Sequence, residues 1–360
     1  MCLKIGYIRA FIRHIMQQQN IDILQSKQHF HILDGLRGVA ALAVVIFHFM
    51  EMVFLDYSKN FIAHGFLAVD FFFCLSGFVI AYAYDDRIAN MGIKAFFISR
   101  LIRLQPLVIA GSILGFLTFL FDPFVTYQST YGVGRLGLIL LASMLLIPFP
   151  VMAERYFNLF GLNAPAWSLF WEYAANIIYA FVLYKMSRRY LLLLTVFFAI
   201  ILCIVSYRTG NLMGGWGKDT FKDGGARIGY SFLAGLLIYR SGWIIKSKLG
   251  FPALSVLLAL AFVMPWTKWN GITDALVVIF YFPLLIALGT GAKLTSAMKR
   301  ICIFSGRISY PLYMTHYAAL WMFNNYINSR QPVTKKTTNA YHSRKYNCFD
   351  RNSLPVYGNV

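Results

Sequence analysis

Residues 33–48 read LDGLRGVAALAVVIFH and open a long apolar region of the chain. Between Arg37 and His48 this stretch holds no charged residue, and apolar runs of membrane-spanning length follow one another after it. We predict a helix for each run, because a backbone exposed to lipid must satisfy its hydrogen bonds internally and the alternation typical of a membrane barrel is absent. The predicted spans lie near 38–55, 65–84, 104–121, 136–151, 166–184, 190–206, 226–240, 251–266, 272–290 and 308–327.

The composition of the 360 residues is that of a protein embedded in lipid. Hydrophobic residues make up 59% and charged residues 13%, against roughly 45–50% and 25% in soluble domains. A soluble fold of this composition would expose large apolar patches, and disordered chains and small disulfide frameworks are excluded. The five cysteines show no metal-ligand spacing, so we expect no metal. The predicted fold class is an all-α integral membrane protein, a bundle of about ten transmembrane helices.

The formal net charge of +19 fits short loops held at the cytoplasmic leaflet. No basic module with interleaved aromatic residues indicates nucleic-acid binding. Lysine and arginine gather in the N-terminal segment and in alternate loops, which predicts a multi-pass protein of the cell membrane with a cytoplasmic N-terminus. Three candidate spans between Arg103 and Lys185 conflict with this scheme, because an odd number of crossings cannot return the chain to the same side. We therefore favour a re-entrant or tilted element in 136–165, which holds three prolines and would line a cavity.

The sequence divides into three parts. Residues 1–33 form a basic cytoplasmic segment, in which isoleucines at steps of three and four fit a helix on the membrane surface and a frayed tail almost equally well. Residues 34–328 form the transmembrane domain. Residues 329–360 are polar and basic without a spanning run, which predicts a disordered tail.

Ionisable side chains inside spans are costly and usually face the protein interior, so each of them is a functional candidate. Arg37 and His48 share a helical face, because eleven residues make three turns of about 3.67 residues. This arrangement puts Arg37 at the cytoplasmic mouth and His48 near the middle of the bilayer, where an imidazole can act as a base near neutral pH. A packing histidine beside an arginine that only sets topology fits the same spacing.

Two further stretches carry candidates. Asp70 lies one turn inside the second span and can pair with a buried arginine, whereas Ser76, followed by a glycine, fits close helix packing better than catalysis. Arg100 and Arg103 are one turn apart, and two guanidinium groups on one face bind phosphate oxygens well. Ordinary positive flanking of a span explains the two arginines equally well.

A polar stripe runs through the stretch NAPAWSLFWEY at 163–173. Trp167 precedes Ser168, and Glu172 follows Ser168 by one helical turn. A carboxylate in this position must be paired, protonated or in contact with water. It can orient an imidazole or bind a substrate hydroxyl, and structural packing is the less favoured interpretation. His316, at the end of SYPLYMTH, is a weaker candidate that fits helix packing better.

Together these stretches resemble the membrane acyltransferase-3 family, which includes bacterial O-acetyltransferases that act on glycans. The family's Arg-x10-His element is similar to Arg37 and His48, and its FF-x-x-SGF element to FFCLSGF at 72–78. Its Arg-x-x-Arg element resembles Arg100 and Arg103, and its WSL-x-x-E element resembles Trp167–Leu169 with Glu172. SYPLYMTH resembles the motif of the family's final helix. The likeness runs from about residue 29 to 325, and the segment after Arg330 departs from the family's pattern.

The resemblance implies transfer of an acyl group from a cytoplasmic acyl-CoA, such as acetyl-CoA, to a hydroxyl of a surface or lipid-linked carbohydrate. We expect Arg37, Arg100 and Arg103 to hold the donor's phosphates. We expect His48 to act as the base and Glu172 to position either the acceptor or the imidazole. The partners implied are acyl-CoA, the carbohydrate acceptor and the lipid bilayer.

A proton-coupled transporter that exports a glycan or lipid is the alternative function, with a relay formed by His48, Asp70, Glu172 and His316. The two halves of the chain show no convincing inverted repeat, which argues against this alternative. A non-catalytic protein that assists assembly of a surface polymer is the third hypothesis. The sequence does not name the acceptor sugar, which we expect to meet loops such as 122–135 and 207–226.

Overall fold

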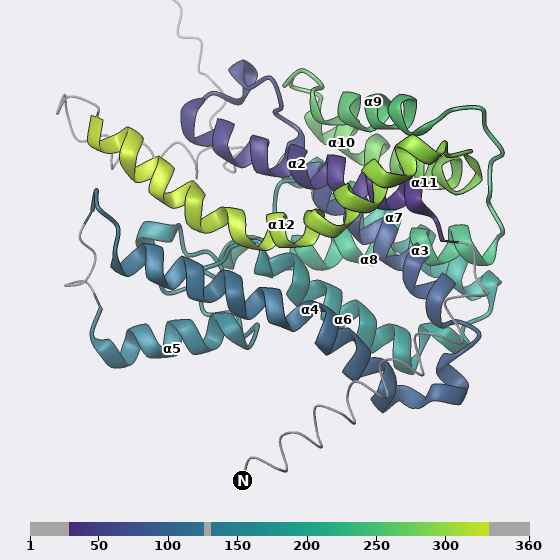
Figure 1. Ribbon diagram of the computed structural model, residues 1–360, viewed down its shortest axis with the longest axis horizontal. Helices are drawn as coiled ribbons and strands as arrows, with labels where there is room; N and C mark the ends of the chain where they lie inside the picture. The colour runs from purple at the N-terminus through teal and green to yellow at the C-terminus, as the bar shows by residue number, and fades with distance from the viewer. Residues whose placement is uncertain (1–28, 126–130, 331–360) are drawn as a thin grey trace, which may run out of the picture.

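The computed structural model describes residues 29–125 and 131–330, and within these ranges the chain folds into helices without a strand (Figure 1). The predicted N-terminal surface helix lies outside the described residues, as does the predicted tail from residue 331 onward. The first two residues of that predicted tail belong to the last helix, which ends at Arg330.

The helical elements follow one another with short connections. In chain order they are α2 (His31–Val53), α3 (Ala68–Tyr84), α4 (Ile88–Leu120), α5 (Val133–Met144), α6 (Ala166–Phe181), α7 (Arg188–Thr209), α8 (Phe221–Arg240), α9 (Phe251–Phe262), α10 (Asn270–Leu276), α11 (Phe282–Gly291) and α12 (Ser296–Arg330). A π-helical turn, Val277–Tyr281, joins α10 to α11. Each predicted span falls on one of these elements, although 136–151 is helical only as far as Met144.

Five described segments are long and apolar enough to cross a membrane: α2, Gly65–Tyr84, α4, α7 and the α10–α11 unit. Helices α5 and α9 have 12 residues each, and α6 has 16. Helices α8 and α12 are longer but contain several charged residues. The helical membrane fold is therefore confirmed, while the predicted number of ten spans is not.

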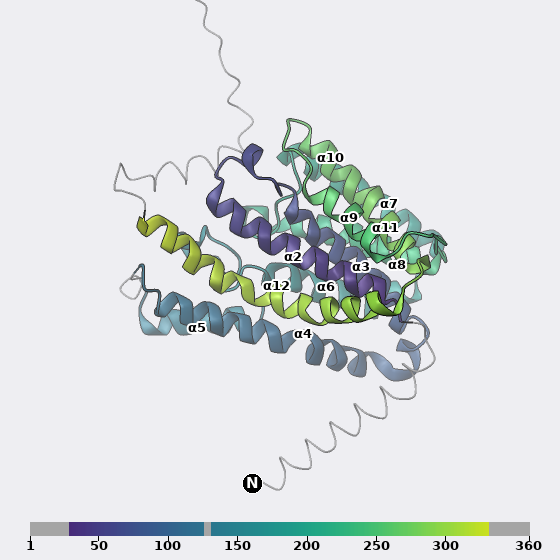
Figure 2. The ribbon, with the colours of Figure 1, turned by 45° about the horizontal axis from the view of Figure 1, so that its top comes forward.

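The bundle is built around two helix pairs, α2 with α12 and α3 with α8. Helix α12 lies between α2 and α4 in both views (Figure 1 and Figure 2). Glycines let α3 and α8 approach at backbone distance: a Cβ at Gly77 would collide with the carbonyl of Phe232, and one at Gly235 with the carbonyl of Cys74. This is the close packing of small residues typical of membrane helices.

The loops predicted to lie on one side of the membrane gather at one end of the bundle, here called the basic end. Arg240, at the end of α8, donates from Nε to Asp85 Oδ2 (2.7 Å) in the α3–α4 turn. It also donates to the backbone carbonyls of Leu183 and Met186 in the α6–α7 connection (2.9 and 3.1 Å). The sequence therefore grouped these loops correctly by their charge. The side of the membrane on which they lie stays a prediction.

Helix α5 fits the re-entrant or tilted element predicted in 136–165. It lies beside the half of α4 that is remote from the basic end (Figure 1), with Ser143 Oγ 2.8 Å from Ser112 Oγ. Its last residue, Met144, accepts a hydrogen bond from Gln105 Nε2 (2.5 Å), near the middle of α4. Twelve residues span about 18 Å, less than the roughly 30 Å of a hydrocarbon core. The chain then turns back through irregular structure to α6, as expected of a half-spanning element.

Candidate active site

A cavity of about 370 Å³ lies between α2, α3, α4, α6 and α12, and four arginines line it. We call it the arginine cavity. Its charged lining residues are Arg37, Arg100, Arg103, Arg307 and Glu172. Four guanidinium groups against one carboxylate leave a formal excess of three positive charges. The structure thus brings together the three predicted phosphate-binding arginines and adds Arg307 of α12, which no sequence motif marks as a candidate.

Packing of α2 against α12 fixes the position of Arg37. Its Nε donates to Ser309 Oγ (2.9 Å) and its Nη2 donates to the carbonyl of Gly306 (2.7 Å). Asp34, one turn earlier on α2, lies 3.5 Å from the same guanidinium. These contacts fix the orientation of the guanidinium group, which still lines the cavity.

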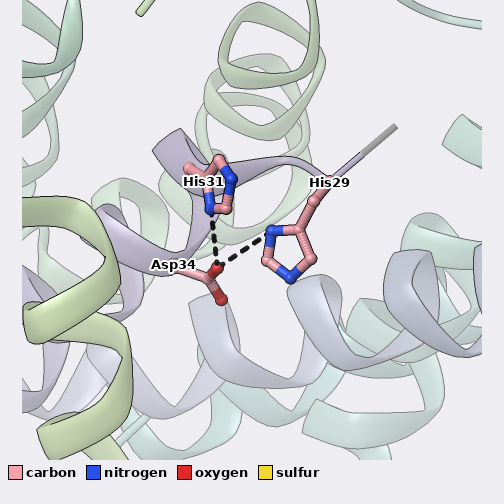
Figure 3. Close-up of side chains that lie close together, drawn as sticks. All are labelled: His29, His31 and Asp34. Carbon is pink, nitrogen blue, oxygen red and sulfur yellow. Dashed lines mark ion pairs between the residues drawn. The ribbon is translucent and has the colours of Figure 1, made fainter. Parts of the chain in front are cut away.

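Two imidazoles flank the carboxylate of Asp34 (Figure 3). His29 Nδ1 lies 3.4 Å and His31 Nδ1 4.0 Å from Asp34 Oδ2, so three possible metal-ligand atoms lie close together. Arg37 and the positive end of the α2 dipole act on the same carboxylate, and both oppose a cation. We therefore interpret Asp34 as the counter-ion of Arg37. The expectation that the protein needs no metal stays a prediction.

On the opposite wall, Arg100 and Ser76 converge on one carboxylate oxygen. Arg100 Nη2 and Ser76 Oγ both donate to Glu172 Oε1, each at 2.9 Å. Arg103 lines the same cavity and donates no hydrogen bond to the residues that the structure describes. Glu172 therefore orients Arg100, while Arg103 keeps its donors available to a ligand.

His48 lies in a second, smaller cavity of about 80 Å³, which we call the histidine pocket. His48 Nδ1 is 2.8 Å from Glu51 Oε1, and Tyr57 Oη donates to Glu51 Oε2 (3.1 Å). A carboxylate that accepts from Nδ1–H leaves the lone pair of Nε2 available as a base. Glu51 is thus the acidic partner of the imidazole, and Glu172 lies in the other cavity. The sequence signal was a glutamate three residues after the histidine on one helix.

His48 lies closer to the end of its helix than the apolar run predicts, and its depth in the bilayer stays a prediction. Helix α2 begins at His31 and ends at Val53, so His48 lies near the end of the span that is remote from the basic end, rather than at its middle. The apolar run predicted a start near residue 38, but the helix continues through the polar HILDGLR segment before it. Arg37 and His48 are still separated by about 16 Å along the helix axis.

His316 of α12 lies against His48, with ring centroids 5.4 Å apart and planes inclined by 18°. His316 is buried, and its Nδ1 is 2.7 Å from the carbonyl of Tyr313, which makes Nδ1 the donor. Its Nε2 has no hydrogen-bond partner among the described residues. The structure therefore brings His316 together with His48, whereas the sequence favoured helix packing for His316.

Tyr313 and Val69 form the wall between the two cavities, because both residues line both of them. The Tyr313 and Ser168 hydroxyl oxygens are 2.9 Å apart. At the start of α6, Ser168 lines the arginine cavity and its neighbour Trp167 lines the histidine pocket. The WSL segment thus contributes to both sides of this wall.

Asp70 serves the scaffold. Its two carboxylate oxygens accept from Arg227 Nε (3.1 Å) and Nη2 (2.6 Å), and both side chains are fully buried. Arg227 also donates to the carbonyls of Gly214 and Phe66 (2.8 and 3.1 Å). The prediction that Asp70 pairs with a buried arginine is confirmed, and the sequence reading did not name Arg227 as that partner.

Comparison with known proteins gives the following matches. A family model described as an acyltransferase domain matches residues 30–340. "Protein 2 in picA locus" of Rhizobium radiobacter is 35% identical over 162 residues, which cover 42% of this chain and 82% of that protein. Proteins of Staphylococcus aureus strains COL and MSSA476, provisionally named O-acetyltransferases, are 41% identical over 81 residues. That match covers 21% of this chain and only 12% of the staphylococcal proteins. No solved structure matches.

Proposed function

The chain belongs to the acyltransferase-3 family, and we propose that it transfers an acyl group, most simply acetyl, from acyl-CoA to a hydroxyl of a surface or lipid-linked carbohydrate. The observation that carries this proposal is the shared wall of the arginine cavity and the histidine pocket. A site for a polyanion and a carboxylate-oriented base adjoin each other inside one helical bundle. The names of the staphylococcal relatives support the acetyl group.

The arginine cavity suits the phosphates of a CoA donor. Guanidinium groups form charge-assisted, bidentate hydrogen bonds to phosphate oxygens, and Arg103 has its donors available for them. The cavity lies toward the basic end, where Arg37 is six residues into α2. Positive loops face the cytoplasm in most membrane proteins, so the donor would enter from the compartment that supplies acyl-CoA.

The separation of the two sites favours a long donor over a compact one. Arg37 and His48 are about 16 Å apart along α2. A donor that binds both must carry its charged phosphates and its reactive carbonyl at opposite ends of an extended arm. The pantetheine arm of acyl-CoA has this form. A compact donor such as acetyl phosphate cannot contact the arginines and reach the imidazole at the same time.

The proposed chemistry is direct transfer with His48 as general base. His48 Nε2 takes the proton of the acceptor hydroxyl as its oxygen attacks the thioester carbonyl. The tetrahedral intermediate collapses by breaking the carbon–sulfur bond, and the imidazolium returns the proton to the departing CoA thiolate. Glu51 keeps the imidazole in the required tautomer and stabilises its charged form. General-base assistance of this kind contributes about 10²–10⁴ in rate.

A transfer assay in membranes tests the proposal. Membranes that contain the protein are incubated with radiolabelled acetyl-CoA, and label on envelope carbohydrate is measured. We expect transfer by the native chain, a loss of about 10²–10⁴ for His48→Ala, and no loss for Leu42→Ala, an exposed residue of the same helix. Label that stays on CoA with the native chain contradicts the proposal and favours the transporter. Full activity of His48→Ala contradicts its role as base.

A further inference from the structure

A third cavity, of about 260 Å³, opens beside the histidine pocket, and we call it the outer cavity. Tyr156 and Trp216 line both of these cavities. The other lining residues are Phe157, Arg208, Thr209, Gly217, Lys218, Asp219, Thr220 and Asp223. They come from the 153–159 loop, the end of α7, the α7–α8 connection and the start of α8, so the outer cavity lies at the end of the bundle remote from the basic end.

Backbone hydrogen bonds hold the wall of the outer cavity in place. The segments on either side of it pair as a short ladder, in which Leu159 N donates to the carbonyl of Trp216 (2.9 Å) and Lys218 N to that of Phe157 (3.3 Å). Tyr156 and Phe157 both have a left-handed backbone, with φ of 56° and 50°. Such a conformation is unfavourable for side chains of this size and is concentrated at functional sites. Here it brings two successive aromatic residues to the lining of one cavity.

The charge of the outer cavity differs from that of the arginine cavity. Arg208 and Lys218 are balanced by Asp219 and Asp223, and Arg208 forms an ion pair with the buried carboxylate of Asp223. A balanced set of donors and acceptors next to aromatic rings suits a neutral ligand rich in hydroxyl groups. The volume is just below the roughly 300–1,000 Å³ of pockets for drug-sized ligands, which fits a single ring.

We propose that the outer cavity binds one neutral pyranose ring of the acceptor and directs a hydroxyl between Tyr156 and Trp216 toward His48. Trp216 supplies an apolar face for the ring, while Arg208 and Asp223 bind its hydroxyls. This inference rests on the proposed acyl transfer, because it assigns the acceptor side of the same reaction. It makes this end of the bundle the determinant of acceptor specificity.

Competition against the transfer reaction tests the ligand class. Neutral methyl glycosides (of glucose, galactose, mannose and N-acetylglucosamine) and the anionic methyl glucuronide are added separately to membranes that transfer labelled acetyl to envelope carbohydrate. We expect at least one neutral glycoside to inhibit transfer and the glucuronide to be at least tenfold weaker. Inhibition by none of them, or equal inhibition by the glucuronide, overturns the inference while transfer itself persists. Absence of transfer by the native chain instead contradicts the proposed function.

Three variants test whether Arg208 and Trp216 bind the acceptor. Arg208→Gln alters an exposed side chain and should raise the KM for the carbohydrate acceptor about tenfold, as expected when a hydrogen bond to a charged group is lost. Trp216→Ala should do the same and Trp216→Phe should recover most of the loss. The KM for acetyl-CoA should stay within twofold of the native value in all three. An unchanged acceptor KM in Arg208→Gln and Trp216→Ala, or equal effects on both substrates, overturns the assignment.

Discussion

Arg227 and Arg103 are both arginines of membrane helices, but their surroundings differ. Arg227 is 1% exposed and directs its donors to Asp70 and to two backbone carbonyls. Arg103 lines a cavity and donates to none of the described residues. A guanidinium whose donors are satisfied within the protein belongs to the scaffold, whereas one with open donors beside other cations is suited to an anionic ligand. Residue type and depth alone do not distinguish the two roles.

The largest expected effect is the loss of stability when Arg227, the arginine of the scaffold, is replaced. Arg227→Met leaves the carboxylate of Asp70 buried without its partner, and breaking such a pair lowers the free energy of unfolding by about 3–5 kcal/mol. Thermal unfolding in detergent micelles measures the loss, with Leu42→Ala as the exposed control. A change below about 1 kcal/mol, the size typical of ordinary substitutions, would assign Arg227 no structural role.

The next effect concerns the chemical step. Glu51→Gln removes the carboxylate that orients His48 and stabilises its charged form, so kcat should fall about 10²-fold while the KM for acetyl-CoA is unchanged. Steady-state kinetics with labelled acetyl-CoA measures both constants. Asp56→Asn removes an exposed carboxylate close to the end of the same helix and serves as the control. If kcat of Glu51→Gln equals that of the control, the His48–Glu51 pair is not the catalytic base.

A smaller effect is expected on the binding of acetyl-CoA when Arg103 is replaced. Arg103→Gln removes a cavity guanidinium with open donors, and the loss of one charge-assisted contact should raise the KM for acetyl-CoA about tenfold. Stability should stay close to native, in contrast to Arg227→Met. Arg189→Gln removes an exposed arginine at the basic end outside the cavity and should leave KM unchanged. Equal KM values for the two variants would contradict phosphate binding in the arginine cavity.

The smallest effect concerns the wall between the cavities. Tyr313→Phe keeps the ring but removes the hydrogen bond with Ser168, worth about 1 kcal/mol. A looser wall should admit water to the thioester, so hydrolysis of acetyl-CoA without acceptor should rise a few-fold. Tyr326→Phe, an exposed residue of the same helix outside both cavities, is the control. Unchanged hydrolysis in Tyr313→Phe would show that this hydrogen bond does not keep water from the thioester.

The sequence predicted the helices well because continuous apolar runs of spanning length mark helices in a membrane protein. It also predicted a re-entrant or tilted element in 136–165, since the charge pattern required an even number of crossings and the prolines supplied a break, and the short helix α5 fits this prediction. It did not predict that α2 extends through the polar HILDGLR segment, because hydropathy alone marks where apolar residues begin. That extension places His48 near the end of its span rather than at its middle.

The candidate site was predictable only where its residues share a helix or a motif. Arg100 and Arg103 are one turn apart, so their proximity follows from local geometry. Arg307 lines the arginine cavity and His316 lies against His48 only because α12 packs on α2, about 270 residues away in sequence, which no local spacing reveals. Glu51 was detectable locally, because it follows His48 by three residues on one helix. The WSL-x-x-E motif instead favoured Glu172 as the residue that positions the imidazole or the acceptor.

The most direct test of the account is an experimental structure with a non-hydrolysable acetyl-CoA analogue in which a methylene group replaces the thioester sulfur. We expect phosphates in contact with Arg37, Arg100, Arg103 or Arg307, and the analogue's carbonyl carbon beyond Tyr313, near His48 Nε2. Phosphates bound at the opposite end of the bundle, or a carbonyl that stays on the arginine side of Tyr313 and turns away from His48, would contradict the proposed path of the acyl group.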